Sequence, residues 1–187
     1  ELWDAGAADL AEKVGDSITE WSATGSQGAR GWFSGYWDRG RDGDDFYAPE
    51  DFVPFPRDEG PFGATDFWNG VAWDWPGGDP PWTFMDADFW HPNGEDTGDE
   101  QWPIRRWQNP VNGDLLIRWR VAKAQNGGGG VTGHVFQNGA QLDFADIAGG
   151  DLAGVERFVV AYGAQAGDVF DFALDPRGRN GSRDSGG

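Results

Sequence analysis

The sequence predicts an all-β fold, an antiparallel β-sandwich of the jelly-roll type with long aromatic-rich loops and a short N-terminal helix. Two features lead to this prediction. The second half is a series of short segments with alternating apolar and polar residues, separated by turn residues, as in sandwiches, jelly rolls and barrels. The first half contains long stretches of Gly, Pro, Asp and aromatic residues, which favour a jelly roll with one decorated end.

The stretch Trp102–Trp107, Trp-Pro-Ile-Arg-Arg-Trp, separates these two kinds of sequence. Asn112-Gly113-Asp114 and Asn138-Gly139 are predicted hairpin turns, because Asn and Gly accept the positive φ that tight turns require. We therefore expect antiparallel pairing after this stretch. Strands are predicted at residues 104–108, 115–124, 130–137, 140–144, 157–162 and 169–174.

Alternation within two of these segments predicts which side chains are buried. In the first, one face carries Leu115, Ile117, Trp119 and Val121, and the other carries Arg118 and Arg120. In the second, the buried face is expected to carry Phe170, Phe172 and Leu174, rather than Val169, Asp171 and Ala173. Both segments are typical of half-buried strands.

The N-terminal part is predicted to begin with a helix over residues 1–15, where apolar residues recur at roughly helical spacing and Gly15 is a stop signal. Residues 16–21 and 32–37 suit strands, and the second of these carries aromatic side chains on both faces. We expect residues 16–187 to form a single jelly-roll domain.

Residues 38–101 show no sustained helical or strand periodicity of apolar residues and combine Asp, Gly and Pro with many aromatic residues. Loops of more than about 12 to 15 residues are usually functional or disordered, and dense aromatics disfavour disorder. Short strands are expected near residues 66–75 and 82–90, with prolines interrupting the rest.

Composition excludes several classes of function. A formal net charge of -18 makes nucleic acid and anionic membranes poor partners, because both would be repelled. The acids fit three interpretations: oxygen ligands for Ca²⁺, a surface suited to salty surroundings, or simple solubility. With no cysteine and two histidines, thiolate chemistry and histidine-rich metal centres are disfavoured, and no apolar run is long enough for a membrane span.

An ordered set of motifs resembles a jelly-roll domain of secreted bacterial proteins that is similar to carbohydrate-binding modules. The motifs are Gly31-Trp32-Phe33-Ser34-Gly35-Tyr36-Trp37, Pro81-Trp82-Thr83-Phe84, His91-Pro92, Ile104-Arg105-Arg106-Trp107, Gly127 to Gly130, Val135 to Gly139, Ala166 to Phe172 and Asp175-Pro176-Arg177-Gly178. The resemblance covers about residues 16–185 and implies an extracellular or cell-surface setting. The sequence begins with Glu1 instead of Met, which is consistent with a processed secretory precursor.

The resemblance also implies one more strand after the loop of residues 175–184. Because the chain stops at Gly187, we expect the sandwich to lack its last strand. A sandwich without that strand has an open edge, which invites strand addition from another chain.

Calcium is the expected ion, and the best candidate ligands are Asp175, Asn180 and Asp184, with Asp16 completing the site from the other end of the chain. Ca²⁺ prefers several hard oxygen ligands, and glycines between the three would allow the loop to wrap. The alternative is an exposed turn with solvated acids. A second candidate is the group Asp38, Asp42, Asp44 and Asp45, weakened by the prospect that Arg39 and Arg41 pair with these acids.

The predicted carbohydrate surface is aromatic, because flat rings stack on the apolar faces of sugars. Its residues are Trp32, Tyr36, Trp37, Trp68, Trp73 and Trp75, and the alternative is that most of them pack in the core. Arg105 and Arg106 are adjacent in a predicted strand, so their side chains point to opposite faces and one of them points inward. A buried arginine would need to pair with an acidic side chain.

Two functions follow from the sequence. The first is a secreted, non-catalytic module that binds a polysaccharide or glycan through its aromatic loops and is stabilised by calcium. The second is a structural subunit of an extracellular filament, surface layer or larger complex, a homo-oligomer or one of several neighbouring subunits, which assembles through aromatic loops and strand addition. An enzyme is disfavoured, because His91 has no serine partner or paired base at a recognisable spacing.

Overall fold

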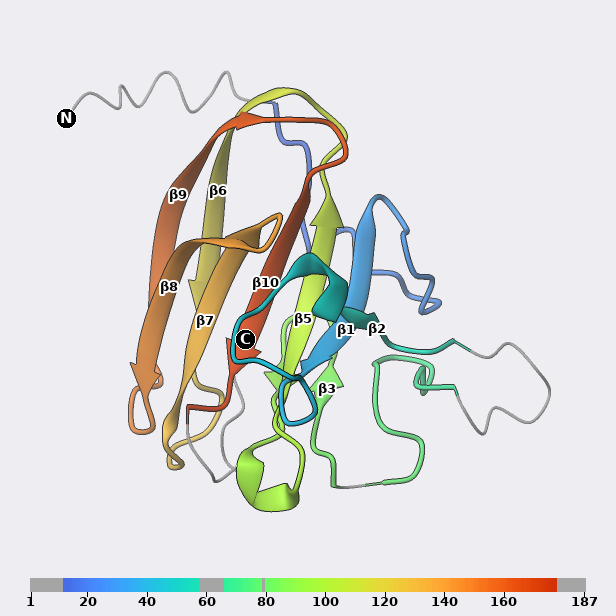
Figure 1. Ribbon diagram of the computed structural model, residues 1–187, viewed down its shortest axis with the longest axis vertical. Coiled ribbons are helices and arrows are strands. Elements are labelled where there is room, and N and C mark those ends of the chain that lie inside the picture. The colour runs from blue at the N-terminus through green and yellow to red at the C-terminus, as the bar shows by residue number, and fades with distance from the viewer. Residues whose placement is uncertain (1–11, 58–65, 79, 178–187) are drawn as a thin grey trace.

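The computed structural model describes residues 12–57, 66–78 and 80–177, and nearly all of its regular structure is antiparallel β (Figure 1). The strands are β1 (Trp32–Asp38), β2 (Val53–Pro54), β3 (Phe84–Met85), β4 (Trp90–His91), β5 (Gln101–Gln108), β6 (Gly113–Val121), β7 (Gly130–Gln137), β8 (Ala140–Ala148), β9 (Val155–Ala164) and β10 (Val169–Asp175). Two single-turn 3₁₀ helices, η2 (Pro49–Asp51) and η3 (Glu95–Thr97), complete it. The all-β prediction is confirmed, and within the described ranges no helix is long and apolar enough to cross a membrane.

Six strands form the larger sheet, in the order β2-β1-β5-β10-β7-β8, while β6 pairs only with β9 and β3 pairs with β4. The chain therefore leaves the larger sheet after β5 and again after β8, and each time it returns after one strand. The prediction of a hairpin at Asn112-Gly113-Asp114 is wrong, because this turn carries the chain from β5 into the smaller sheet. The Asn138-Gly139 hairpin is confirmed, with positive φ of 50° and 82° joining β7 to β8.

The smaller sheet packs on the inner face of the larger one. Trp119 and Val121 of β6 join Val131, Val135 and Leu174 in one core cluster, and a second cluster brings further residues of β6, β9 and β10 together. The alternation predicted for residues 115–121 is confirmed, because positions 115, 119 and 121 are buried while 116, 118 and 120 are exposed. The larger and smaller sheets thus form two layers.

Strand β10 lies in the middle of the larger sheet and is buried on both faces. Phe170 is 0% exposed on the inner face, as the alternation predicts. Asp171 on the opposite face is also 0% exposed, so the expectation that this face is the solvated one is wrong. The loop between β1 and β2 covers it, with Tyr47 and Phe52 packed on the outer face of the sheet.

A buried ion pair on this outer face replaces the expected solvent. Arg106 Nε and Nη2 donate to the two carboxylate oxygens of Asp171, at 2.7 and 2.9 Å. Tyr47 donates its hydroxyl hydrogen to the same carboxylate, and Arg106 also donates to the Pro49 carbonyl oxygen, at 2.8 Å each. The pair thereby ties the covering loop to two central strands, and burial beside Asp171 raises the pKa of Tyr47 far above its ordinary value.

The strand and helix predicted for the N-terminal part are not confirmed in the described residues. The strand predicted at residues 16–21 is wrong, because residues 17–20 form a turn in which Asp16 Oδ1 accepts hydrogen bonds from the N–H groups of Ile18 and Thr19. Residues 12–15 are not helical, and the rest of the predicted helix lies outside the described residues. The segments near 66–75 and 82–90 contain isolated bridges and the short β3–β4 pair. The missing last strand stays a prediction.

Replacing Asp171 with Ala should lower the free energy of unfolding by about 3–5 kcal/mol, because it leaves the Arg106 guanidinium buried without its counter-charge. Tyr47→Phe removes one hydrogen bond from the same network and should cost about 1 kcal/mol. Urea unfolding followed by tryptophan fluorescence measures both. Glu156→Ala, which breaks an exposed pair with Arg118, is the control and should leave the midpoint unchanged; equal midpoints for the Asp171 variant and this control would contradict the assignment.

Candidate functional site

A row of aromatic rings crosses the outer face of the larger sheet. Trp37 of β1 meets Trp102 of β5 edge to face, with ring centroids 4.9 Å apart. Trp102 stacks on His134 of β7 at 5.0 Å and an interplanar angle of 14°, and His134 in turn faces Phe144 of β8 at 6.3 Å. Strand β10 lies between β5 and β7 and carries only Ala173 at this level, paired across from His134, so the larger rings have room to meet.

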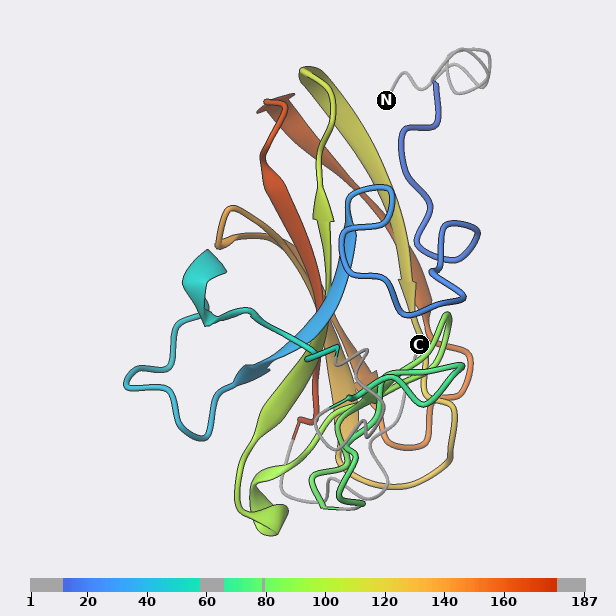
Figure 2. The ribbon, with the colours of Figure 1, turned by 90° about the vertical axis from the view of Figure 1, so that its right-hand side faces the viewer.

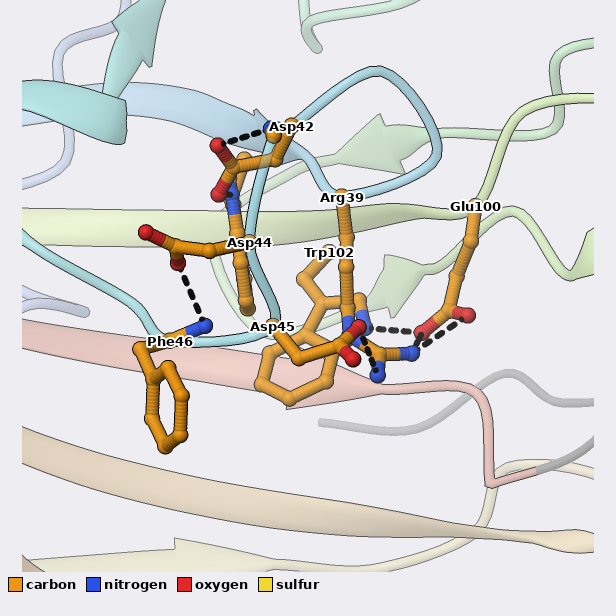
Figure 3. Close-up of polar contacts among 9 residues, drawn as sticks. Arg39, Asp42, Asp44, Asp45, Phe46, Glu100 and Trp102 are labelled. Carbon is orange, nitrogen blue, oxygen red and sulfur yellow. Dashed lines mark hydrogen bonds and ion pairs between the residues drawn. The ribbon is translucent and has the colours of Figure 1, made fainter.

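Arg39, directly after β1, lies over this row. Its guanidinium carbon is 5.8 Å from the Trp102 ring centroid and 6.0 Å from that of Trp37. Nη1 donates to both carboxylate oxygens of Glu100, at 3.0 and 2.8 Å, and Nη2 donates to Asp45 at 2.9 Å. Figure 3 shows this guanidinium between the two carboxylates. Burial disfavours its charge, but the hydrogen bonds and attraction to Glu100 outweigh this and raise the pKa of Arg39.

The indole nitrogens of the two tryptophans bond to acids on either side of Arg39, one before β5 and one in the loop after β1. Trp102 Nε1 donates to Glu100 at 2.6 Å, and Trp37 Nε1 donates to Asp42 at 2.9 Å. At Gly40 the loop passes so close to β5 that a Cβ would lie 2.7 Å from the Glu100 nitrogen, which explains the glycine. The loop is therefore fixed to the sheet at its base, while Phe46 further along is 80% exposed.

A polar groove of about 300 Å³ opens beside Arg39. Its lining residues are Arg39, Gly40, Asp45, Glu95, Gly98 and Glu100. Three carboxylates and one guanidinium face a single opening, and two of the carboxylates already hold Arg39 in place. Such a set offers rigid, planar hydrogen-bonding groups, which suit a polyhydroxylated ligand better than an apolar one.

The six aromatic residues predicted to bind carbohydrate do not share one surface. Trp37, Trp68 and Trp73 are 2%, 9% and 2% exposed, so their faces are covered by protein. Trp68, Trp73, Trp75 and Tyr36 belong to a cluster with Phe55, Phe67 and Met85 on the inner side of β1. Trp32 packs on Trp107 and Phe172 and donates to Glu20 at 2.8 Å. Most of the set packs in the interior, which corresponds to the core-packing alternative.

The predicted calcium ligands divide between two places. Gly15, next to Asp16, lies against the Trp107 ring, and Trp107 pairs with Phe170 at the start of β10. Asp175 ends that strand five residues later, roughly 17 Å away at about 3.3 Å per residue. The two acids therefore do not form one site. Asn180 and Asp184 lie outside the described residues, and the part of the chain that the structure describes contains no group of three potential metal-binding His, Cys, Asp or Glu side chains.

The two described acids are engaged in other contacts. The ammonium of Lys13 and the N–H groups of Thr19 and Ile18 lower the pKa of Asp16 to about 2. Asp175 accepts a hydrogen bond from the N–H of Arg177 at 2.6 Å. Both carboxylates thus accept hydrogen bonds within local turns.

In the second acidic group the expected arginine pairing is confirmed. Arg39 contacts Asp45, while Arg41 lies 2.6 Å from Asp99 and 3.8 Å from Asp38. These acids position the loop rather than surround an ion. His91 is 9% exposed, faces Trp82 and places Nδ1 2.7 Å from the Pro92 carbonyl oxygen, which is the geometry of a loop-packing histidine.

The second surface of interest is the outer face of the smaller sheet, here called the β6–β9 face. Its apolar residues are Leu116, Phe158 and Tyr162, which are 47%, 59% and 78% exposed. Arg118 and Arg120 of β6 share this face, and Arg118 Nη2 donates to Glu156 at 2.6 Å. Sequence analysis missed this face, although residues 158–162, Phe-Val-Val-Ala-Tyr, are apolar at every position and therefore leave one apolar side outside the core.

No protein-family model matches the sequence, and no curated protein matches it.

Glu100→Gln tests whether the Arg39 contacts hold the groove together. The substitution keeps the shape but removes a charge whose oxygens accept hydrogen bonds from Arg39 and Trp102, and it should lower the free energy of unfolding by about 2 kcal/mol. Asp45→Asn, at a side chain 81% exposed, is the matched control and should have a much smaller effect. Thermal or urea unfolding measures both, and equal losses would sink the idea that the buried carboxylate anchors Arg39.

Proposed function

We propose that this chain is a non-catalytic, jelly-roll-type β-sandwich subunit that assembles with further copies of itself. The exposed apolar β6–β9 face carries the proposal. Monomeric proteins rarely leave neighbouring large apolar side chains in water, and such patches usually mark contact surfaces. The crossings between the two sheets support the jelly-roll assignment, which is part of the same proposal.

The open edges of the smaller sheet support the same conclusion. Within the described chain β6 and β9 form ladder hydrogen bonds only with each other, so the outer edge of each strand has no hydrogen-bonded partner strand. Unpaired strand edges present rows of N–H and C=O groups, and natural proteins usually blunt or cover them. A second chain that docks here would cover both the apolar side chains and an edge.

The charges on the β6–β9 face favour contact with the acidic loop after β1 of a second copy. The part of the β6–β9 face around Phe158 carries Arg118, Arg120 and Glu156, two positive charges and one negative, and Asp114 lies at its far end beside Gly163, in a protein of net charge -18. The loop after β1 offers the complement, because exposed Phe46 follows acids at positions 42, 44 and 45. An aromatic side chain within an acidic loop suits an aromatic face that contains arginines.

The two surfaces lie on opposite sides of the molecule. Tyr47 and Phe52 attach the loop to the outer face of the larger sheet, whereas β6 and β9 pack on its inner face. Figure 2 shows the loop and the smaller sheet on different sides. They therefore do not meet within one copy, and contact between copies would be head to tail. Head-to-tail contacts that do not close into a ring produce filaments.

Two variants that each remove one surface test this proposal in solution. Wild-type protein should increase in mass with concentration in sedimentation velocity. Phe46→Ser alone and Phe158→Ser alone should stay monomeric, because each lacks one half of the junction. Their equimolar mixture should form dimers and nothing larger, because only one intact junction remains between the two variants.

Phe144→Ser is the matched control for these variants, because it removes another half-exposed phenylalanine that lies on neither surface. This variant should assemble like the wild type. Wild-type protein that remains monomeric at high concentration, or a mixture that forms long assemblies, would overturn the proposed junction.

A second candidate function is carbohydrate binding, which the polar groove beside Arg39 favours. Carboxylates and a guanidinium in fixed positions suit pairs of neighbouring sugar hydroxyl groups. The candidate sugar site thus moves from the predicted aromatic platform to Asp45, Glu95 and Glu100. Calcium as a stabilising ion and an extracellular setting remain part of this second proposal.

A glycan panel with and without chelator tests the second candidate. Binding should be seen with wild-type protein and fall at least tenfold in Asp45→Asn and Glu95→Gln, because each replaces a groove carboxylate with an amide. Phe158→Ser should bind as the wild type does, which separates this function from assembly. No binding to any glycan would exclude it, and an unchanged melting temperature with chelator would exclude calcium.

A further inference from the structure

Arg105 is a buried cation on the inner face of β5. The residue is 2% exposed, and its guanidinium lies between two indole rings, 4.5 Å from the centroid of Trp21 and 5.1 Å from that of Trp90. Cation–π contact with both rings compensates for part of the lost hydration. It does not supply a negative charge.

The hydrogen-bond partners of Arg105 are neutral. Nη1 donates to the carbonyl oxygens of Ser17 and Ala87, at 3.1 and 2.9 Å, and Nη2 donates to that of Asp86, at 2.5 Å. Among the described residues Nε has no acceptor. The expectation that the inward-facing arginine pairs with an acid is therefore wrong for Arg105, for which no ion pair is seen in the described ranges. The acid pair belongs to Arg106 on the outer face, which contacts Asp171.

Burial lowers the pKa of Arg105 to about 9, and the more distant charges of Asp86 and Asp88 oppose this only in part. A buried charge without a partner is costly, and the cost falls if an anion enters beside it. The guanidinium thus combines a deficit of negative charge with an Nε–H that has no acceptor among the described residues.

A small cavity adjoins Arg105 and has room for about one water-sized particle. Its lining residues are Ser17, Glu20, Trp21, Ser22, Ser26, Ala29, Trp32, Ser34, Trp73 and Arg105. Four serines in this lining are potential hydroxyl donors. Glu20 is the one acid in it, and its carboxylate accepts hydrogen bonds from Trp32 Nε1 and the Asp16 N–H and lies 3.6 Å from Arg30.

We propose that this cavity binds a single halide ion, chloride in solution, held by Arg105 Nε and the serine hydroxyl groups around it. The ion supplies the charge that the carbonyl oxygens cannot supply. Sulfate, phosphate and carboxylates are all larger than a halide and fit this small cavity less well. A water molecule fits the same space but leaves the guanidinium without a counter-charge.

Diffraction from crystals grown in sodium bromide tests the site directly. An anomalous peak at the bromine edge, within hydrogen-bond distance of Arg105 Nε, is expected. Density at that position with no anomalous signal identifies a water molecule and overturns the proposal.

Thermal unfolding gives an independent solution test on the intact chain. At constant ionic strength, replacing sodium gluconate with sodium chloride should raise the melting temperature by roughly 3–6 °C once chloride exceeds its dissociation constant tenfold. Ser34→Ala, which removes a cavity hydroxyl but keeps Arg105, should require several-fold more chloride for the same rise. Glu156→Ala, at an exposed residue of the smaller sheet that does not line the cavity, is the control and should respond like the wild type. Equal melting temperatures in the two salts would also overturn the proposal.

Discussion

Two adjacent arginines on a central strand hold the long loops of this protein against its larger sheet. Because successive side chains of a strand point to opposite faces, Arg105 reaches the inner face and Arg106 the outer one. Arg105 donates hydrogen bonds to the carbonyl oxygens of residues 17, 86 and 87. Arg106 donates to the Pro49 carbonyl oxygen and the Tyr47 hydroxyl oxygen. Irregular backbone needs partners for its carbonyl groups, and a guanidinium with five N–H donors supplies several at once.

The aromatic residues follow from the same constraint. A loop that packs on a sheet without ladder hydrogen bonds must bury area through side chains, and large rings bury most per residue. Tyr47 and Phe52 do this on the outer face, and the cluster of Phe55, Trp68 and Trp73 does it on the inner one. Trp37 of β1 and Trp102 of β5 also pack against this loop side of the sheet, and their indole N–H groups donate to Asp42 and Glu100, which satisfies the polar part of these two rings. The aromatic richness of the first half is therefore largely structural.

Sequence reasoning located strands well and connections poorly, for physical reasons. The segment 130–137 was predicted with its observed bounds, because its alternation and the Asn138-Gly139 turn are local signals. The crossing at Asn112-Gly113 depends on which sheet each strand joins, and no local pattern carries that information. Asp171 was assigned to the wrong environment because a period of two cannot reveal that a loop distant in sequence covers the second face of β10. For the same reason, the groove at Arg39 joins residues about 60 positions apart, and no spacing could have indicated it.

The pattern of burial along β5 has a consequence for how this protein can change over generations. From Gln101 to Trp107, six of the seven residues are buried and Arg106 is partly buried. A strand with no side open to water offers no position at which a random substitution is harmless. We expect Trp102 to Trp107 to drift slowest among descendants of this chain, while Phe46, which is 80% exposed, is under no such packing constraint.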